Sequence, residues 1–322
     1  MSAKVAALRC GSYSQAELEP AVERLLGLLG GLERFVSRGA KVLLKPNLLK
    51  ASEPESCVTT HPALVKCLAG MVLEAGGKPF IGDSPAWGSL GRVAERAGLK
   101  RVAKEMCIPL VPFDHPVKVE NRGGRVYRRL TLDRAVLEAD VIINLPKLKT
   151  HQQLLLSGAI KNCFGCVPGK RKAWWHFKAG SYENYFALML VEVFQLVRPT
   201  LNILDGVIAM EGNGPVNGSP RPLGTILASE DAVALDRILC HALGVEAESW
   251  CILAAAKELE AGPQNLEEIE LVGEPLEAIA VPDFKLPRTM SIGFSLPRVV
   301  KSALKNQWII RVEEGRTAGR SS

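Results

Sequence analysis

The segment from Ser157 to His176 holds most of the residues whose types could do chemistry. Its sequence, SGAIKNCFGCVPGKRKAWWH, contains Lys161, a C-x-x-C pair and a basic run after a glycine turn. Between Val141 and Tyr182 the chain has seven Lys or Arg residues and no Asp or Glu. A bound phosphate or carboxylate would supply the missing counter-charge, so this segment predicts an anion-binding site. It is not a P-loop, because the spacing G-x-x-x-x-G-K-[ST] is absent.

Polar residues also follow several apolar runs that are typical of buried strands. These residues are Lys45, Asn47, Asp83, Asn144, Lys147, Asp205, Glu211, Asn213 and the pair Glu230–Asp231. Ligands of open α/β sheets bind beyond the carboxyl ends of the strands, so we expect these side chains to meet in one cleft. A helix N-cap explains an isolated Asp. Lysine is a poor cap, so Lys45 and Lys147 indicate an anionic ligand.

The elements that must position these residues alternate between strand-like and helix-like segments. Apolar runs occur at 4–8, 40–44, 78–82, 139–144, 200–204 and 224–228, and helical periodicity at 15–36, 61–76, 182–197 and 231–244. This alternation predicts an α/β fold, a mainly parallel sheet with helices on both faces. The segment 115–132 predicts one exposed β-hairpin. We expect an α/β domain over residues 1–282 and a basic, irregular C-terminal appendage over 283–322.

The bulk composition narrows the class of protein. The chain has 322 residues, of which 47% are hydrophobic and 23% charged, which indicates a globular fold. No apolar run is long enough to cross a bilayer and no signal peptide is recognisable, so we expect a cytoplasmic protein without a membrane span. Much of the net charge of +6 lies after residue 282, where eight Lys/Arg face three Asp/Glu. No nucleic-acid-binding module accompanies this tail, so no nucleic-acid partner is predicted.

Two histidines and two cysteines surround the lysine-rich segment. His151 and His176 flank Lys161, and together the three could serve as acid, base and anchor. Cys163 and Cys166 have the spacing of a metal or redox pair, but two thiols in a glycine-rich turn are the simpler interpretation. A four-iron cluster needs four thiolates, and the usual C-x-x-C-x-x-C run is missing.

The ordered blocks VLLKPNLL, TTHPALV, GDSP, ADVIINLPKLKTH, SGAIKNCFGCVPGKRKAWWH, LDGVIAMEGNGPVNGSPRPLG and ASEDAVALD resemble the domain-of-unknown-function 362 family. The resemblance covers about residues 4–284 and implies an α/β domain. Many members carry a C-terminal ferredoxin module, which implies a link to iron–sulfur electron transfer, on this chain or on a partner. This sequence departs from that pattern, since no cysteine follows Cys251.

A fainter resemblance joins about 40 residues to the nickel-pincer lactate racemase family. His151 precedes Lys161 by ten residues and His176 follows it, in the order that the family shows. The resemblance implies that Lys161 anchors a phosphorylated nickel cofactor, that His176 ligates the metal and that His151 is an acid or base.

The sequence is therefore compatible with three functions. The first is an enzyme with iron–sulfur-linked or metal-dependent redox chemistry that binds an anionic cofactor or substrate and has a ferredoxin-like partner. The second is a racemase or isomerase of a hydroxy acid with a lysine-anchored nickel nucleotide, and the third is a non-catalytic carrier of a cofactor or cluster. The predicted catalytic residues are His151, Lys161, Asp83 and Asp205. The predicted cofactor-binding residues are Lys45, Asn47, Lys147, Lys149, Lys161, Asn162, Gly165, Gly169, Lys170 and Lys172. The predicted metal ligands are His176, Cys163 and Cys166.

Overall fold

A computed structural model describes residues 2–169, 171, 172, 175 and 184–290. The predictions made for Lys170, His176 and the tail after residue 290 fall outside these residues. The described residues form a ten-stranded sheet, whose main path runs β12-β1-β11-β10-β7-β2-β3-β4. Its strands are β1 (Ala3–Arg9), β2 (Lys41–Pro46), β3 (Lys78–Asp83), β4 (Leu110–Pro112), β7 (Val141–Leu145), β8 (Lys147–His151), β9 (Leu155–Ser157), β10 (Leu201–Asn213), β11 (Asn217–Ser229) and β12 (Ile269–Gly273).

Most strands of the main path run in one direction, as the sequence predicted. β7 pairs in parallel with β2 and with β10, β2 with β3, β3 with β4, and β1 with β12. Strand β11 is antiparallel to both β1 and β10, so β1 has the same direction as β10. The carboxyl ends of β1, β2, β3, β7 and β10 therefore lie at one edge, which we name the carboxyl edge, and the opposite edge is the amino edge.

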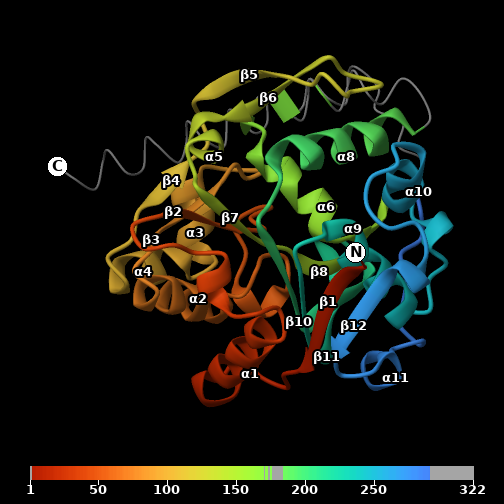
Figure 1. Cartoon of the computed structure of the whole chain (residues 1–322), viewed down its shortest axis with the longest axis horizontal. Helices are drawn as coiled ribbons and strands as arrows, with labels where there is room; N and C mark the ends of the chain where they lie inside the picture. The colour runs from red at the N-terminus through yellow and green to blue at the C-terminus, as the bar shows by residue number, and fades with distance from the viewer. Residues whose placement is uncertain (1, 170, 173–174, 176–183, 291–322) are drawn as a thin grey trace.

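Helices cover both faces of this sheet, because alternate residues of each strand belong to different apolar cores. Ala6, Leu8 and Leu44 pack on the core that includes the first four helices, whereas Val5 and Leu43 pack on the other core. Figure 1 shows the first group of helices on one side of the sheet and the later ones on the other. The first group is α1 (Gln15–Gly27), α2 (Pro62–Glu74), α3 (Leu90–Arg96) and α4 (Leu99–Glu105). The later helices are α5 (Arg134–Leu137), α6 (Ala159–Asn162), α8 (Tyr185–Val197), α9 (Ala232–Ala242), α10 (Cys251–Glu258) and α11 (Leu276–Ile279).

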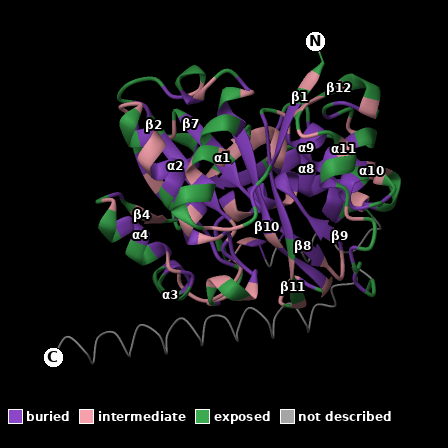
Figure 2. Cartoon of the chain, turned by 90° about the horizontal axis from the view of Figure 1, so that it is seen from below, coloured by how far each residue is buried: buried purple, intermediate pink, exposed green. Residues whose placement is uncertain are grey.

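The layered packing leaves the strands of the sheet buried and the outer helix surfaces exposed, as Figure 2 shows. The predicted β-hairpin is confirmed. It consists of β5 (Pro116–Glu120) and β6 (Arg129–Asp133), which pair antiparallel as a separate two-stranded sheet. Its side chains alternate between exposed and half-buried along β5, which is the pattern expected of a ribbon with one solvated face.

One prediction about the sheet is wrong. We expected the run 224–228 to be another strand whose carboxyl end joins the cleft, but β11 is antiparallel and its end lies at the amino edge. Strands β10 and β11 form a long hairpin that pairs from Asn202–Ser229 to Asn213–Asn217. Glu230 and Asp231 are therefore on the other side of the molecule from the predicted site. Glu230 pairs with Arg34 there, and Asp231 caps α9.

The last described residues lie on this hairpin. The backbone N–H of Gly212 donates to the carbonyl of Lys285, and that of Met290 donates to the carbonyl of Gln152. The side chain of Phe284 is buried in the core beneath the later helices. The domain boundary at residue 282 stays a prediction. Among the helices that the structure describes, none has both the length and the apolar character required to span a bilayer.

Candidate functional site

Lys45 and Asp83 form a buried ion pair at the ends of β2 and β3. The Nζ–Oδ1 distance is 3.1 Å, and Lys45 Nζ also donates to the Pro46 carbonyl at 2.8 Å. The carboxylate of Asp83 accepts further hydrogen bonds from the backbone N–H groups of Leu48 and Ser84, both at 2.8 Å. Both oxygens of Asp83 are thus occupied, so in this geometry Asp83 balances and positions Lys45.

Lys147 and Asp205 form a second buried pair where β8 begins beside β10. Their Nζ–Oδ1 distance is 2.9 Å, and Lys147 Nζ also donates to the hydroxyl of Tyr13 at 2.7 Å. That hydroxyl donates to Asp205 Oδ1, and the backbone N–H of His61 donates to Asp205 Oδ2 at 2.8 Å. The rings of Tyr13 and His61 are stacked, with centroids 3.6 Å apart. Burial lowers the pKa of His61 to about 4, so this imidazole is neutral at physiological pH.

Sequence analysis missed Tyr13 and His61. Tyr13 comes soon after the end of β1, and His61 is the N-cap of α2, where its ring accepts a hydrogen bond from the N–H of Ala63. The rule that directed us to the other strand ends would have found Tyr13 as well. It was not applied to the residues that follow β1.

Lys149 is buried without a carboxylate partner. Its ammonium group donates to the side-chain oxygen of Asn47 and to the carbonyl of Val58. Burial, together with the neighbouring charges of Lys161 and Lys147, holds the pKa of Lys149 well below its usual range. Lys149 therefore raises the electrostatic cost of the site, which the more distant charge of Asp83 offsets in part.

A chain of four asparagine amides runs from Lys149 across the strand ends. Asn47 Nδ2 donates to Asn162 Oδ1 at 2.9 Å, and Asn162 Nδ2 donates to Asn144 Oδ1 at 2.8 Å. Asn144 Nδ2 donates to Asn202 Oδ1 at 2.9 Å. These residues come from the end of β2, from α6, from β7 and from β10, so the chain ties four segments together without using a charge.

Lys161 lies on α6, a single turn whose first N–H groups are held by a buried carboxylate. The N–H groups of Ala159 and Ile160 donate to Asp236 of α9, at 2.7 and 3.1 Å. Burial raises the pKa of Asp236 to about 7 in spite of these two bonds. Lys161 is half-buried, and among the described residues its ammonium group has no hydrogen-bond or ion-pair partner. Burial and the nearby charge of Lys45 lower its pKa to about 8.

Lys172 completes the group of lysines. Its ammonium group donates to the carbonyl of Ser84 and lies 5.9 Å from the ring centroid of Phe164. Burial lowers its pKa to about 8, an effect that Lys45 increases and Asp83 opposes. The backbone at Gly165 lies directly against the Lys45–Asp83 pair. A Cβ at this position would collide with the Asp83 carboxylate and the Lys45 ammonium group, so the position requires glycine. We name Lys45, Lys147, Lys149, Lys161 and Lys172 the lysine cluster.

The comparison with protein families identifies the chain. The family described as "Domain of unknown function (DUF362)" matches residues 42–241, which include every lysine of the cluster. The chain belongs to the DUF362 family. The resemblance inferred from the sequence is thus confirmed.

Two known proteins are similar to this DUF362 chain, one in sequence and one in structure. A thylakoid-associated protein of Synechocystis sp., sll1697, is 43% identical over 321 residues, covering 98% of this chain and 97% of that protein. Among solved structures, the lactate racemase apoprotein of Thermoanaerobacterium thermosaccharolyticum has a TM-score of 0.45 at 11% identity. The similarity covers 73% of this chain, which spans about half (55%) of that structure.

The structure brings most of the residues predicted to be catalytic or cofactor-binding in the DUF362 chain together at the carboxyl edge. They are Lys45, Asn47, Asp83, Lys147, Lys149, Lys161, Asn162, Gly165, Lys172 and Asp205. Gly169 lies near the hydroxyl of Ser84. His151 ends β8 two residues after Lys149, and its Nδ1 accepts from the N–H of Gln153 at 3.2 Å. Lys170 and His176 lie outside the described residues.

Cys163 and Cys166 lie in the core and not on an exposed loop. Both side chains are fully buried, and burial raises the pKa of Cys166 to about 12 and that of Cys163 well above its usual range. Both are therefore protonated thiols of low nucleophilicity as they stand in the core. Within the described residues, no three His, Cys, Asp or Glu side chains are grouped so that they could hold a metal ion.

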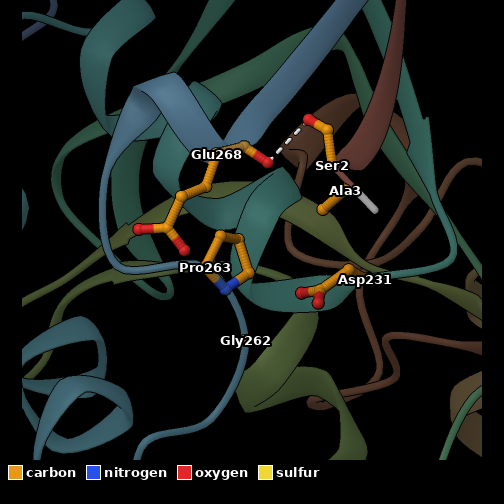
Figure 3. A pocket seen from close by; sticks show the side chains of 6 residues that line it. All are labelled: Ser2, Ala3, Asp231, Gly262, Pro263 and Glu268. Carbon is orange, nitrogen blue, oxygen red and sulfur yellow. Dashed lines mark hydrogen bonds between the residues drawn. The ribbon is translucent and has the colours of Figure 1, made fainter.

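The amino edge of the sheet has a surface depression of a different character. Its lining residues are Ser2, Ala3, Asp231, Gly262, Pro263 and Glu268 (Figure 3). Asp231 accepts from two N–H groups at the start of α9, and Glu268 forms a capping box with Asn265. These carboxylates have local structural roles, so we assign no ligand to this depression.

Proposed function

We propose that the lysine cluster binds the anionic group of a small molecule, a phosphate or carboxylate, which the chain uses as a cofactor or substrate. One observation carries the proposal. Lys161 is half-buried beside other lysines, and its ammonium group has no acceptor among the described residues. Buried charges are ordinarily paired, so an unpartnered lysine in such a setting is explained best by a ligand that supplies the acceptor.

The two carboxylates that pair with lysines of the cluster cannot supply the acceptor for Lys161. Asp83 is occupied by Lys45 and two backbone N–H groups, and Asp205 by Lys147, Tyr13 and the N–H of His61. We therefore assign Lys161 to direct contact with the ligand, and Asp83 and Asp205 to positioning. Asn47, Gly165 and Lys161 are partly exposed, so solvent reaches the cluster at these residues.

The reaction that we assign to the site rests on fewer observations than its binding of an anion. Iron–sulfur-linked redox chemistry follows only from family association, and Cys163 and Cys166 supply two of the four thiolates that a four-iron cluster needs. In this proposal an iron–sulfur centre belongs to a ferredoxin-like partner. A carrier without catalysis remains the alternative, and it predicts that replacing His151 leaves ligand retention unchanged.

A second candidate is an isomerase or racemase in which Lys161 bonds covalently to a nickel nucleotide. The observation that favours it is the lowered pKa of Lys161, about 8, because a deprotonated amine is the nucleophilic form. A mass increase confined to the peptide that contains Lys161 in the purified protein would support this candidate. An unmodified peptide would exclude a permanent adduct.

The proposal is tested by thermal unfolding with sodium phosphate or sodium lactate, against sodium chloride at equal ionic strength. We expect the midpoint of the wild-type chain to rise by several degrees in at least one of the two, since a ligand at about 100 times its Kd adds about 2.7 kcal/mol. Lys161→Met should lose the response. Lys66→Met is the matched control, because Lys66 is exposed and pairs only with Glu105. Equal responses of all three proteins would contradict the proposal.

A further inference from the structure

We infer that the anionic group is a phosphate monoester, and that the site takes up protons as this dianion binds. The inference rests on the proposed function, since it concerns the ligand of the same cluster. It goes beyond that function by choosing between phosphate and carboxylate and by specifying a proton count.

The first argument is the balance of charge. The cluster contains five lysines, and the carboxylates paired with them are those of Asp83 and Asp205. Lys149, Lys161 and Lys172 have no carboxylate partner among the described residues. A monocarboxylate could balance the ammonium form of one of these three lysines, whereas a phosphate monoester, with about two negative charges near pH 7, could balance two.

The second argument is the direction of the donors. Lys149 lies on β8, Lys161 on α6, and Lys172 after the turn that follows Cys166, so their ammonium groups come from three separate elements. Each ammonium group has three N–H donors. Lys149 uses two of them on Asn47 and Val58, Lys172 uses one on Ser84, and Lys161 uses none. A phosphate presents three terminal oxygens in different directions around one atom, whereas a carboxylate presents two in one plane.

Two buried hydroxyl groups beside Lys149 support a polar ligand. Ser157 faces Lys149 in the β8–β9 register, and Thr59 follows Val58, whose carbonyl accepts from Lys149. Neither hydroxyl oxygen has a hydrogen-bond partner within the part of the chain that the structure describes. Unsatisfied buried hydroxyl groups are uncommon in proteins. A phosphate bound beside Lys149 would place oxygen acceptors near these two hydroxyl groups.

Proton uptake follows from the state of the lysines before binding. With a pKa of about 8, Lys161 and Lys172 are each about one quarter protonated at pH 8.5. A dianion in contact favours the charged form of both lysines. Through Lys161 and Lys172, binding at pH 8.5 should therefore add roughly one proton or slightly more, while phosphate itself is already a dianion at this pH.

The experiment is calorimetric titration of the full chain at pH 8.5, repeated in two buffers with different enthalpies of ionisation. Inorganic phosphate, glycerol 3-phosphate, malonate and lactate are titrated at one ionic strength. We expect the two phosphates to bind at least about tenfold more tightly than malonate or lactate, with uptake of about one proton. Lys161→Arg keeps its charge at this pH, so it should retain binding but take up about half as many protons. Lys66→Arg should behave as wild type.

The outcomes separate this inference from the proposed function. Malonate or lactate binding as tightly as phosphate would overturn the phosphate inference and leave anion binding intact. Binding of inorganic phosphate without glycerol 3-phosphate would overturn the monoester. Phosphate binding without a buffer-dependent heat would overturn proton uptake. If none of the four anions binds, both the inference and the proposed function fail.

Discussion

The two edges of the sheet differ in how the charged side chains there are bonded. At the amino edge, Asp231 and Glu268 accept hydrogen bonds from backbone N–H groups at the starts of nearby helical turns. At the carboxyl edge, Lys149 and Lys172 bond only to neutral oxygens and Lys161 bonds to nothing among the described residues. The amino edge is complete in itself, whereas the carboxyl edge has a surplus of positive charge. We interpret that surplus as the mark of function, because it lowers stability unless a ligand is present.

The largest expected effect comes from removing a carboxylate at the carboxyl edge. Asp205→Ala would leave the buried Lys147 unpaired and would free the Tyr13 hydroxyl and the His61 N–H. We expect the free energy of unfolding to fall by about 3–5 kcal/mol, measured by urea denaturation. If Asp205→Ala costs no more than an N-cap substitution at the amino edge, the two edges do not differ as we describe.

A smaller effect is expected from pH. Lys161 and Lys172 have folded-state pKa values of about 8, below the ordinary value of 10.5, so the unfolded chain binds more protons between these limits. Their destabilising contribution is fully present below pH 8 and disappears as pH rises toward 10.5. The wild-type chain should therefore gain at most about 3 kcal/mol per lysine over this range relative to a Lys161→Met/Lys172→Met double variant. Parallel pH profiles of the two proteins in denaturant titrations would refute this account.

The smallest effect is expected at the amino edge. Asp231→Ala removes the cap of α9, whose side chain accepts from Val233 and Ala234 at 2.7 and 3.0 Å. We expect a loss of about 1 kcal/mol in urea denaturation and no change in the stabilisation by phosphate. A changed phosphate response would mean that the two edges are coupled, which the comparison does not predict.

The sequence predicted the fold better than it predicted the pairing within the site. The apolar runs that became β2, β3, β7 and β10 were recognisable, and the lysines after them pointed to the correct edge. The direction of β11 could not be predicted. The polar, Gly/Pro-rich segment between residues 211 and 222 is typical of a loop, whereas in the structure it forms the paired ends of two long strands.

The partners of each lysine were also beyond sequence reasoning. Asp83 is the last residue of β3 and Asp205 lies in β10, and both are far in sequence from the lysines that they balance. Only the tertiary structure shows that these two carboxylates are occupied and that Lys161 is not. The same is true of Cys163 and Cys166, whose spacing says nothing of the burial that keeps their thiols protonated.

The asparagine chain has an electrical consequence. Each amide donates through nitrogen to the oxygen of the next, from Asn47 to Asn202, so the four amide dipoles are aligned with an oxygen end toward Lys149. Aligned hydrogen bonds polarise one another. The fold thus stabilises a buried ammonium group with dipoles, which have no net charge. Lys149 is held in place without a carboxylate beside it, so a bound anion can supply the negative charge that favours its ammonium form.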